Sequence, residues 1–423
     1  MREMKDSGIK WIGKIPLTWK IGKVKDVFTR KNEKANIENP TVLSLARSGV
    51  KVRDISNGEG QLAESYTNYN PVEINDLLLN PMDLYSGANC SVSKVEGVIS
   101  PAYINLRPKE NNNSKYYDYY LKTQYWSMAF FAHGKGVSFD NRWTLGLETA
   151  MNYYIPIPPE KEQEKIANYL DKKILEIDNV IEKTKETIED YKKYKQSVIN
   201  EAVTKGLDKN VEMKDSGIDW IGNIPKQWSI QKLKNITKLK TGTTPSTQNA
   251  EWFDGNYNWF TPSDFNENYI MNDSSRKLSK KAKEDNAMTI IPANSTMIIG
   301  IGGTAGKIGY VTEECSCNQQ ITAIIADKVY NKYIMYWMIA NTKYLKETAM
   351  YTTLPIINNE TLGRYLFINP NNIEKEKKIV EYLDKKCAEI DKLISSKQKI
   401  IEELEQYKKS LIYEYVTGKK EVI

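Results

Sequence analysis

The chain contains one long pattern twice, and this repeat constrains its fold more than any other feature. The segment MKDSGIKWIGKIPLTW at 4–19 returns as MKDSGIDWIGNIPKQW at 213–228. Each copy then passes through a long mixed region and closes on a similar polar-apolar segment, at 169–204 and 382–417. At 423 residues the chain also exceeds the size at which one hydrophobic core usually stays single. The repeat therefore predicts two structural units related by a pseudo-two-fold axis, the single-chain equivalent of a homodimer.

The closing segments carry a heptad pattern, because apolar residues in each step alternately by four and three positions. In the first segment the seam consists of Leu170, Ile174, Ile177, Ile181, Thr184, Ile188, Tyr191, Lys195 and Val198. In the second it consists of Leu383, Cys387, Ile390, Ile394, Lys397, Ile401, Leu404, Lys408 and Leu411. No glycine or proline interrupts either segment before Gly206 and Gly418. Each segment is thus expected to form an unbroken helix of about 40 residues, or about 60 Å.

Polar residues occur at equivalent steps of both seams, with Thr184 aligned with Lys397 and Lys195 with Lys408. Polar residues at such positions cost stability but fix the register and the number of helices. We expect the two helices to pair with each other as an antiparallel coiled coil. The alternative is that each helix pairs with another protein.

The regions between the repeated ends, roughly 20–155 and 229–368, have a different character. They hold short β-like runs such as TVLSL, INDLLLN, MTIIP, TMIIGIG and ITAIIA, and helical patches at YYDYYLKTQYW and NKYIMYWMIANTKYL. This mixture predicts two α+β globular domains, each built on a small twisted sheet or barrel. The middles diverge while the ends match, which favours different ligands for the middles and one shared kind of partner for the ends.

Composition excludes several kinds of chemistry. The only histidine, His133, lies in a turn-like HGKG run without a nucleophile motif to serve. The four cysteines lack the paired spacing of a zinc site and read as buried reduced thiols. No run is apolar enough to suggest a membrane span or a signal peptide, so the expectation is a cytoplasmic protein with no membrane partner. The net charge of +6 permits nucleic-acid binding without proving it.

Enzyme motifs are also missing from the sequence. The run TMIIGIGGTAGKIGYV at 296–311 fits a relaxed dinucleotide fingerprint, but Gly306 and Gly309 interrupt any following helix. We predict a glycine-rich hairpin there; the alternative is a loop pressed close to DNA through Thr304 and Lys307. No methyltransferase proline loop, Walker motif or metal cluster accompanies it, so the chain is expected to be non-catalytic and to hold no cofactor.

Loops rich in short polar side chains are the best candidates for a binding surface. Hydroxyl, amide and guanidinium groups suit phosphate oxygens and base edges, although ordinary surface turns would look much the same. In the first copy the candidates are Ser44, Arg47, Ser48, Lys51, Arg53, Asn80, Asp83, Tyr85, Ser86 and Lys135. In the second they are Thr241, Thr243, Thr244, Ser246, Gln248, Asn249, Trp259, Thr261, Ser263, Asp264, Thr304 and Lys307.

Several of these stretches together resemble the specificity subunits of type I restriction-modification enzymes. The signposts are the repeated KDSGIxWIGxIPxxW, KLKTGTTPS at 238–246, IPIPPEKEQEKIANYLD at 155–171 and the heptad helices. At the first junction Pro158, Pro159, Glu162, Gln163 and Ile166 match the family pattern. The second junction departs from it, with Asn371 and Asn372 in place of the second proline-acid pair and Lys375 and Glu376 across the Glu-Gln site.

The resemblance implies two target-recognition domains, at 1–158 and 208–370, joined by spacer helices at 159–207 and 371–423. Each domain would read one half of a split sequence in double-stranded DNA. The resemblance also implies two methylation subunits, which carry S-adenosylmethionine, and motor-nuclease subunits, which use ATP and magnesium. A helix pair of about 60 Å would span between one and two turns of B-DNA, at roughly 34 Å per turn.

The sequence is also compatible with two other classes of protein. A coiled-coil scaffold carrying two carbohydrate- or peptide-binding modules would explain the repeat and the helices equally well. A self-sufficient methyltransferase or nuclease is the third class, and the missing cofactor and phosphate loops argue against it.

Overall fold

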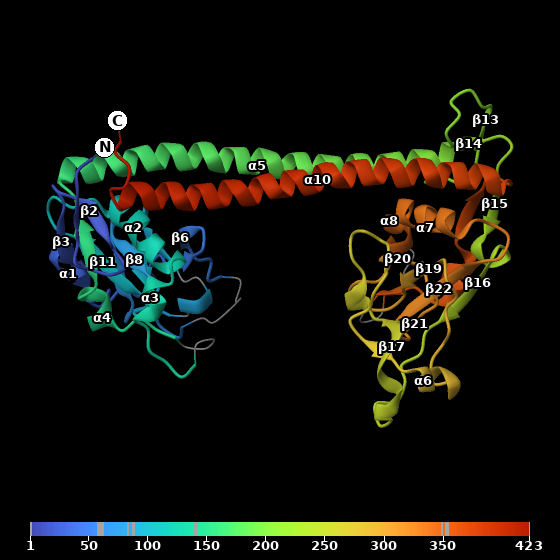
Figure 1. The fold of residues 1–423 in the computed structure, drawn as a ribbon, viewed down its shortest axis with the longest axis horizontal. Coiled ribbons are helices and arrows are strands. Elements are labelled where there is room, and N and C mark those ends of the chain that lie inside the picture. The colour runs from blue at the N-terminus through green and yellow to red at the C-terminus, as the bar shows by residue number, and fades with distance from the viewer. Residues whose placement is uncertain are drawn as a thin grey trace. The chain divides into compact units, whose positions relative to one another are not determined.

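The chain folds into two compact units in a computed structural model (Figure 1). The structure describes residues 2–56, 63–82, 84–86, 89–138, 143–347, 350–351 and 355–422. The first unit combines Met1–Thr184 with Lys399–Ile423, and the second is Lys185–Gln398. The first unit is therefore assembled from both ends of the sequence.

Each unit is built on a four-stranded antiparallel sheet with the same strand order along the chain. The first sheet runs β4 (Phe28–Lys31), β11 (Ile104–Pro108), β8 (Leu77–Leu79) and β9 (Cys90–Val92). The second runs β16 (Thr237–Thr241), β22 (Ile321–Ala326), β19 (Ser295–Ile299) and β20 (Ile308–Val311). The predicted small sheet of an α+β domain is thus present in both units. The two divergent middle regions contain sheets of the same topology.

Smaller strand pairs surround these sheets. The first unit adds β1 (Met4–Asp6) with β2 (Lys14–Pro16), β3 (Lys20–Lys23) with β12 (Tyr154–Ile157), β5 (Leu43–Ala46) with β6 (Gly49–Val52), and β7 (Asn70–Val72) with β10 (Gly97–Ile99). The second adds β13 (Met213–Asp215) with β14 (Asn223–Pro225), β15 (Ser229–Lys232) with β25 (Leu366–Asn369), β17 (Phe253–Phe260) with β18 (Lys277–Leu278) and β21 (Ser316–Cys317), and β23 (Met350–Tyr351) with β24 (Pro355–Ile356). The parallel pairing of β17 with β21 has a smaller counterpart in the first unit, where Val42 forms a parallel bridge with Val98.

Short helices complete each unit. The first has α1 (Val24–Val27), α2 (Ser114–Trp126), α3 (Ala129–Ala132), α4 (Leu147–Met151) and the 3₁₀ turn η1 (Leu84–Ser86). The second has α6 (Lys280–Glu284), α7 (Asn331–Ala340), α8 (Thr342–Glu347), α9 (Asn359–Arg364) and the 3₁₀ turns η2 (Leu233–Asn235), η3 (Ala250–Trp252) and η4 (Pro262–Asp264). The helical patches predicted from sequence correspond to α2 and to α7 with α8.

The central strand β19 shows why its sequence is apolar without alternation. Ile298 packs into a cluster with residues of α7, whereas Met297 and Ile299 pack on the other side with Phe260. A strand that is buried on both faces has no face exposed to solvent, so polar and apolar residues do not alternate along it. β19 and β20 form the predicted glycine-rich hairpin, with Ile298 opposite Ile308. The MTIIP run is different, because it forms no strand and Ile291 makes only an isolated bridge to Cys315.

The repeated opening segment forms the same hairpin in each unit. Asp6 and Asp215 each accept a hydrogen bond of 2.9 Å from the glycine two positions on. Ser7 and Ser216 then accept one of 3.1 Å from the following isoleucine N–H. Asp and Ser side chains that bond their own backbone in this way favour turns, which is why D-S-G-I is repeated.

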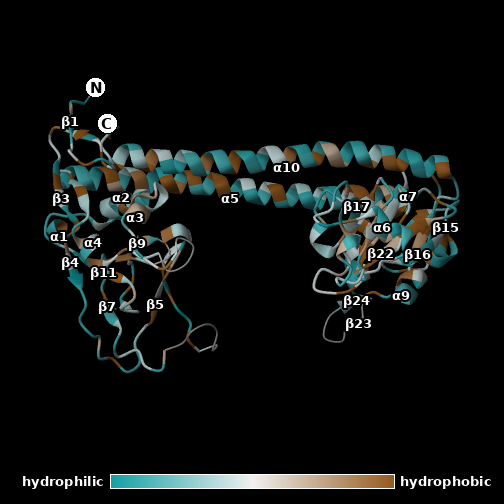
Figure 2. Cartoon of the chain, turned by 60° about the horizontal axis from the view of Figure 1, so that its bottom comes forward, coloured by the Kyte–Doolittle hydropathy of each residue, from teal (hydrophilic) through white to brown (hydrophobic). Residues whose placement is uncertain are grey.

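Two long helices belong partly to each unit, α5 (Glu160–Lys205) with 46 residues and α10 (Ile373–Val416) with 44. Gly206 and Gly418, which follow them, have left-handed φ angles of 78° and 70°. A left-handed glycine is a common helix stop, so the predicted ends are confirmed. Within each unit α5 and α10 lie side by side, and hydrophobic residues recur along both (Figures 1 and 2).

The predicted seam positions are all buried or half-buried. In the first unit Lys408 Nζ lies 2.5 Å from Asp178 Oδ1, and in the second Lys195 Nζ lies 2.7 Å from Asp391 Oδ2. These two pairs occupy aligned positions of the repeat. In each unit, a seam lysine of one long helix therefore reaches an aspartate of the other long helix.

One short helix in each unit docks on both long helices through aligned side chains. On α2, Lys115 and Tyr119 bond Asp171 of α5 at 2.6 and 2.8 Å, and on α7, Lys332 and Tyr336 each bond Asp384 of α10 at 2.7 Å. The Tyr116 hydroxyl donates to the Val416 carbonyl, and the Tyr333 hydroxyl donates to the Val203 carbonyl. These tyrosines satisfy carbonyls in the last turns of the opposite long helix, which lack an intrahelical partner.

All four cysteines are free and buried, as predicted. The thiols of Cys315 and Cys317 have raised pKa values because burial disfavours their charged form.

Candidate nucleic-acid interface

In the first unit, five candidate residues lie on one hairpin. Arg47 and Ser48 form its exposed turn, Lys51 is exposed on β6, and Ser44 and Arg53 are half-buried. The Asn89 side chain donates to the carbonyls of Ala46 and Arg47 at 2.9 and 3.2 Å. Because Asn89 follows the second polar loop directly, this contact brings the two predicted loops of the first unit together.

The second polar loop of this unit, which begins at Asn80, offers fewer available side chains for binding than the sequence predicted. The Asn80 amide oxygen accepts from the Met82 N–H at 3.0 Å, so it shapes the turn. Tyr85 is exposed and lies 6.2 Å from Phe131 between ring centroids. Lys135 is exposed beside a backbone bridge to Thr144. Asp83 and the side chain of Ser86 lie outside the described residues.

In the second unit, the loop after β16 is held by its own threonines. The Asn359 side chain donates to Thr241 Oγ1 at 2.9 Å, and the Thr243 and Thr289 hydroxyls lie 2.6 Å apart. A Cβ on Gly242 would lie 2.2 Å from the Cys317 carbonyl oxygen, so only glycine fits there. Thr244 bonds Gln319, and Ser246 is exposed. The loop therefore presents hydroxyl groups from a fixed backbone.

Trp259 was predicted to lie on the binding surface, but it is buried. Its side chain is only 2% exposed, packs with Leu278, Ala282 and Met288, and donates its indole N–H to the Thr243 carbonyl at 3.1 Å. A ring buried in a core does not reach a DNA groove. Trp259 is thus a support for the threonine loop and not a contact residue.

Arg276, which the sequence reading missed, lies over this tryptophan. Its guanidinium carbon is 4.8 Å from the Trp259 ring centroid and 5.7 Å from that of Phe253. The side chain is exposed and has no carboxylate partner among the described residues. Stacking on an aromatic face positions a guanidinium without neutralising it. The only signal in the sequence was an arginine close to aromatic residues, which is too common to single it out.

Asp264 also serves the fold. Its carboxylate accepts from the backbone N–H groups of Thr261 and Ser275 at 2.7 and 2.9 Å. Burial raises the pKa of Asp264, but the hydrogen bonds from Ser275 and Thr261 outweigh burial and hold that pKa below its usual value. The Thr261 and Ser263 hydroxyls, 2.8 Å apart, stay at the surface of this turn. The carboxylate is therefore engaged, and it also accepts a hydrogen bond of 2.9 Å from the Thr261 hydroxyl, so the exposed Ser263 hydroxyl is the more available group of this turn.

Thr304 and Lys307 are exposed in the loop between β19 and β20. Lys307 lines a hollow of about 710 Å³ that also includes Lys192 and Lys195 of α5 and Asp391 of α10. The hairpin prediction is confirmed, and this loop places Lys307 beside the long helices of the second unit.

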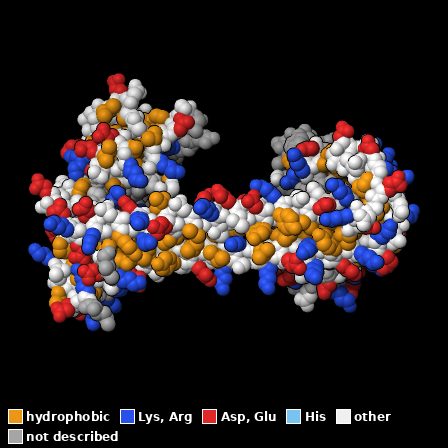
Figure 3. Space-filling model, turned by 90° about the horizontal axis from the view of Figure 1, so that it is seen from above, with side chains coloured by type: hydrophobic (Ala, Val, Ile, Leu, Met, Phe, Trp, Pro, Cys, Tyr) orange, Lys and Arg blue, Asp and Glu red, His pale blue; other side chains and the backbone are white. Residues whose placement is uncertain are grey.

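Exposed hydrophobic side chains are frequent on the two long helices. Val180 and Leu393 occupy aligned positions of the repeat, as do Tyr194 and Tyr407. Figure 3 shows hydrophobic side chains gathered along the helices on the face opposite the sheets. The remaining exposed apolar residues of α5 and α10 are Leu175, Ile373, Tyr382, Ile400 and Tyr413. Apolar patches of this kind mark binding surfaces for other proteins.

No group of His, Cys, Asp and Glu in the described part of the chain has the arrangement of a metal site. None of its helices combines the length and the apolar character that crossing a membrane requires.

Comparisons with known proteins show which family has this architecture. The profile of the type I restriction modification DNA specificity domain matches residues 16–190 and again residues 225–406. The MjaVIII specificity subunit of the type I restriction enzyme from Methanocaldococcus jannaschii is 25% identical over 82% of this chain and 80% of its own length. The MjaIX specificity subunit of the same organism is 31% identical over 44% of this chain and 43% of its own length.

Solved structures show the same fold. A chain from a structure of complex assembly and conformational transition in a type I R-M system superposes with a TM-score of 0.73 at 13% identity, covering 96% of this chain and 99% of its own. The HsdS subunit from Thermoanaerobacter tengcongensis gives a TM-score of 0.52 at 14% identity, covering 96% and 98%. Since the specificity domain is matched twice and the two matches span most of the sequence, the chain belongs to the type I restriction-modification DNA specificity family.

Proposed function

We propose that this chain is the DNA-reading subunit of a type I restriction-modification system, in which each globular domain reads one half of a split target. The observation that carries the proposal is the pair of matching sheets with different loops. A common scaffold fixes the position of each reader, and divergent loops allow the two half-sites to differ. The domain limits 1–158 and 208–370 stay predictions.

The reading surfaces follow from the exposed polar groups. In the first domain the β5–β6 turn offers Arg47 and Ser48, with Lys51 beside them. In the second, the loop from Thr241 to Ser246 and the stacked Arg276 offer hydroxyls and one guanidinium. Such groups bond base edges and phosphates, and arginine pairs best with guanine.

The long helices would act as an antiparallel coiled-coil spacer and as a docking surface. The aligned pairs Lys195–Asp391 and Lys408–Asp178 support a fixed register between them. The aligned exposed residues Val180, Leu393, Tyr194 and Tyr407 support docking of two copies of one partner. We assign that partner role to two methylation subunits, and motor-nuclease subunits would complete the system.

Chemistry would take place in the partners, which would bind S-adenosylmethionine and ATP. The chain itself would be non-catalytic. The alternative of a scaffold with two non-DNA ligand-binding modules is not favoured, because both halves match a DNA specificity domain.

A DNA mobility shift tests this proposal. The chain mixed with its methylation subunit should retard duplex DNA that contains the target, and affinity should fall steeply as salt rises because phosphate contacts release counterions. Retardation that does not depend on sequence or on salt would contradict a DNA-reading role.

A further inference from the structure

The two tryptophans that close the repeated opening segments, Trp19 and Trp228, have different surroundings. In the first unit the Trp19 indole N–H donates to Glu162 Oε2 at 2.9 Å. Arg2 lies over the Trp19 ring, 5.4 Å from its centroid, and forms an ion pair with Glu162. Trp19 is 0% exposed, so arginine and glutamate close this site completely.

The aligned residues of the second unit cannot close the site in this way. Lys375 stands where the first copy has Glu162, and Val211 stands where it has Arg2. Trp228 is 5% exposed, and no oxygen atom among the described residues accepts a hydrogen bond from its indole N–H. The Trp228 Nε1 atom is not one of the fully buried polar atoms that lack a partner, so this donor keeps access to solvent and can bond a ligand.

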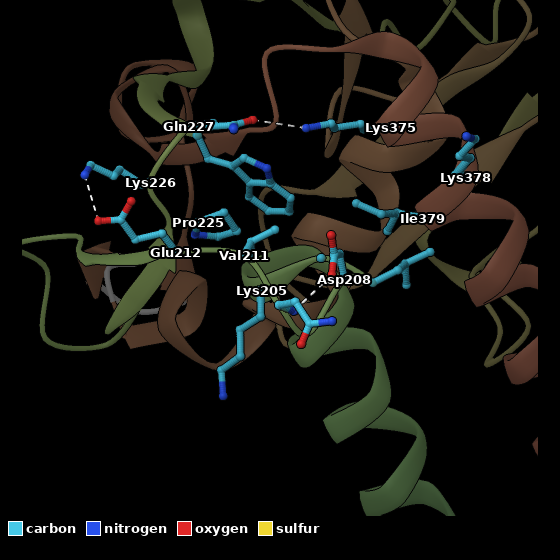
Figure 4. A pocket seen from close by; sticks show the side chains of 14 residues that line it. Lys205, Asp208, Val211, Glu212, Pro225, Lys226, Gln227, Lys375, Lys378 and Ile379 are labelled. Atoms are coloured by element: carbon cyan, nitrogen blue, oxygen red, sulfur yellow. Dashed lines mark hydrogen bonds and ion pairs between the residues drawn. The ribbon is translucent and has the colours of Figure 1, made fainter.

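A cavity of about 490 Å³ lies against Trp228 in place of the missing side chains. Figure 4 shows Lys375 and Lys378 on one side of it, with Ile379 toward its interior and Val211 and Pro225 opposite. We call this space the Trp228 cavity. The lining therefore combines apolar side chains, such as Val211, Pro225 and Ile379, with lysines and other polar residues.

The charges around the Trp228 cavity favour an anion. The Lys375 ammonium bonds only the Gln227 amide oxygen, at 3.3 Å, and Lys378 forms no ion pair among the described residues, although Glu374 on the same helix interacts with it electrostatically. The acidic residues of the lining are already engaged. Glu212 pairs with Lys226 at 2.7 Å, and the Asp208 carboxylate accepts from the Asn210 N–H at 2.9 Å (Figure 4). The first turn of α10 adds the positive end of a helix dipole.

We propose that the Trp228 cavity binds a carboxylate side chain from an acidic segment of a partner protein. The carboxylate accepts from the Trp228 N–H and pairs with Lys375, while its aliphatic stem lies against Val211 and Ile379. The first unit shows that a carboxylate fits against a tryptophan at this position of the repeat, since Glu162 accepts the same hydrogen bond from Trp19. The site goes beyond DNA reading, and it makes the two repeated ends of the chain different for their partners.

The test uses the full-length chain labelled with ¹⁵N-tryptophan, and Trp228→Phe identifies the indole resonance of Trp228. The probe is the capped peptide acetyl-Leu-Glu-Leu-Glu-amide, with the Gln-for-Glu peptide as its matched control. We expect the acidic peptide to shift the Trp228 resonance saturably and to bind about tenfold or more tighter than the control, because a charged acceptor forms the stronger hydrogen bond. Equal binding of the two peptides, or no shift with either, would overturn the proposal.

Three variants make this measurement more specific: two change the cavity and one is a control. Val211→Arg combined with Lys375→Glu rebuilds the arrangement of the first unit and should abolish peptide binding, whereas Lys375→Met should weaken binding without adding an internal carboxylate. Lys280→Met, which removes a lysine of α6, should bind like the unchanged chain. Full binding by Lys375→Met would contradict the proposal, and a larger shift with inorganic phosphate than with the peptide would assign the cavity to another ligand. No DNA is present, so failure here leaves the proposed DNA-reading function intact.

Discussion

Gln163 and Glu376 occupy aligned positions at the starts of α5 and α10 and perform the same task. Gln163 Oε1 accepts from the Asn113 N–H at 2.9 Å before α2, and Glu376 Oε2 accepts from the Tyr330 N–H at 2.6 Å before α7. Gln163 also donates to the Pro158 carbonyl at 2.9 Å, but Glu376 Oε1 has no partner among the described residues. Glu376 is 0% exposed, and burial raises its pKa to about 7, although the bond from Tyr330 opposes the rise.

This carboxyl makes stability depend on pH in a defined direction. Between its ordinary pKa of 4.5 and about 7, the folded state holds a proton that the unfolded state has lost. The contribution to stability is therefore complete below pH 4.5 and is lost as the pH rises through 7. It amounts to a free energy of unfolding on the order of 3 kcal/mol. Denaturant unfolding of the chain and of Glu376→Gln between pH 5 and 8 should give curves that diverge, with the Gln variant losing less stability. Parallel curves would contradict this account.

Arg276 offers a second prediction at the residue scale. Its guanidinium is held over Trp259 and is not neutralised, so Arg276→Ala should weaken target binding by about 1 to 3 kcal/mol, the range for a good arginine contact with a base. Arg364→Ala is the matched control, because Arg364 is also exposed but pairs with Glu360. Binding of the assembled complex to its target duplex measures both. Equal losses in the two variants would remove Arg276 from the reading surface.

At the scale of elements, local patterns predicted the long helices well. The four-three spacing gave their buried face, and the uninterrupted runs up to Gly206 and Gly418 gave their ends. The polar loops were harder to interpret, because a side chain such as Asp264 looks the same in sequence whether it faces a ligand or caps its own turn. The docking of α2 and α7 could not be predicted either, since Tyr116 meets the carbonyl of Val416, a residue 300 positions away in sequence.

The spacer role of α5 and α10 can be tested by removing one heptad from each. Deleting 183–189 and 396–402 preserves the seam pattern and shortens each helix by about 10 Å. The unread spacer between the half-sites should then shorten by about three base pairs, at 3.4 Å per pair. Sequencing the methylated sites of the variant system gives the spacer length. An unchanged spacer would show that the helices do not set it.

At the scale of the whole molecule, the repeat explains why one chain can serve two half-sites. The aligned sheets and the aligned docking contacts of Asp171 and Asp384 give each unit the same framework. The loops that differ are attached to that framework. Recognition of one half-site should therefore be separable from recognition of the other.

The most direct test of this account is a map of methylated adenines in cells that carry the native chain and in cells in which residues 229–368 come from another specificity subunit. The account predicts that methylation requires the chain and that the exchange alters one half of the methylated sequence while the other half persists. A change in both halves, or methylation that persists without the chain, would contradict the central claim of two independent readers on one polypeptide.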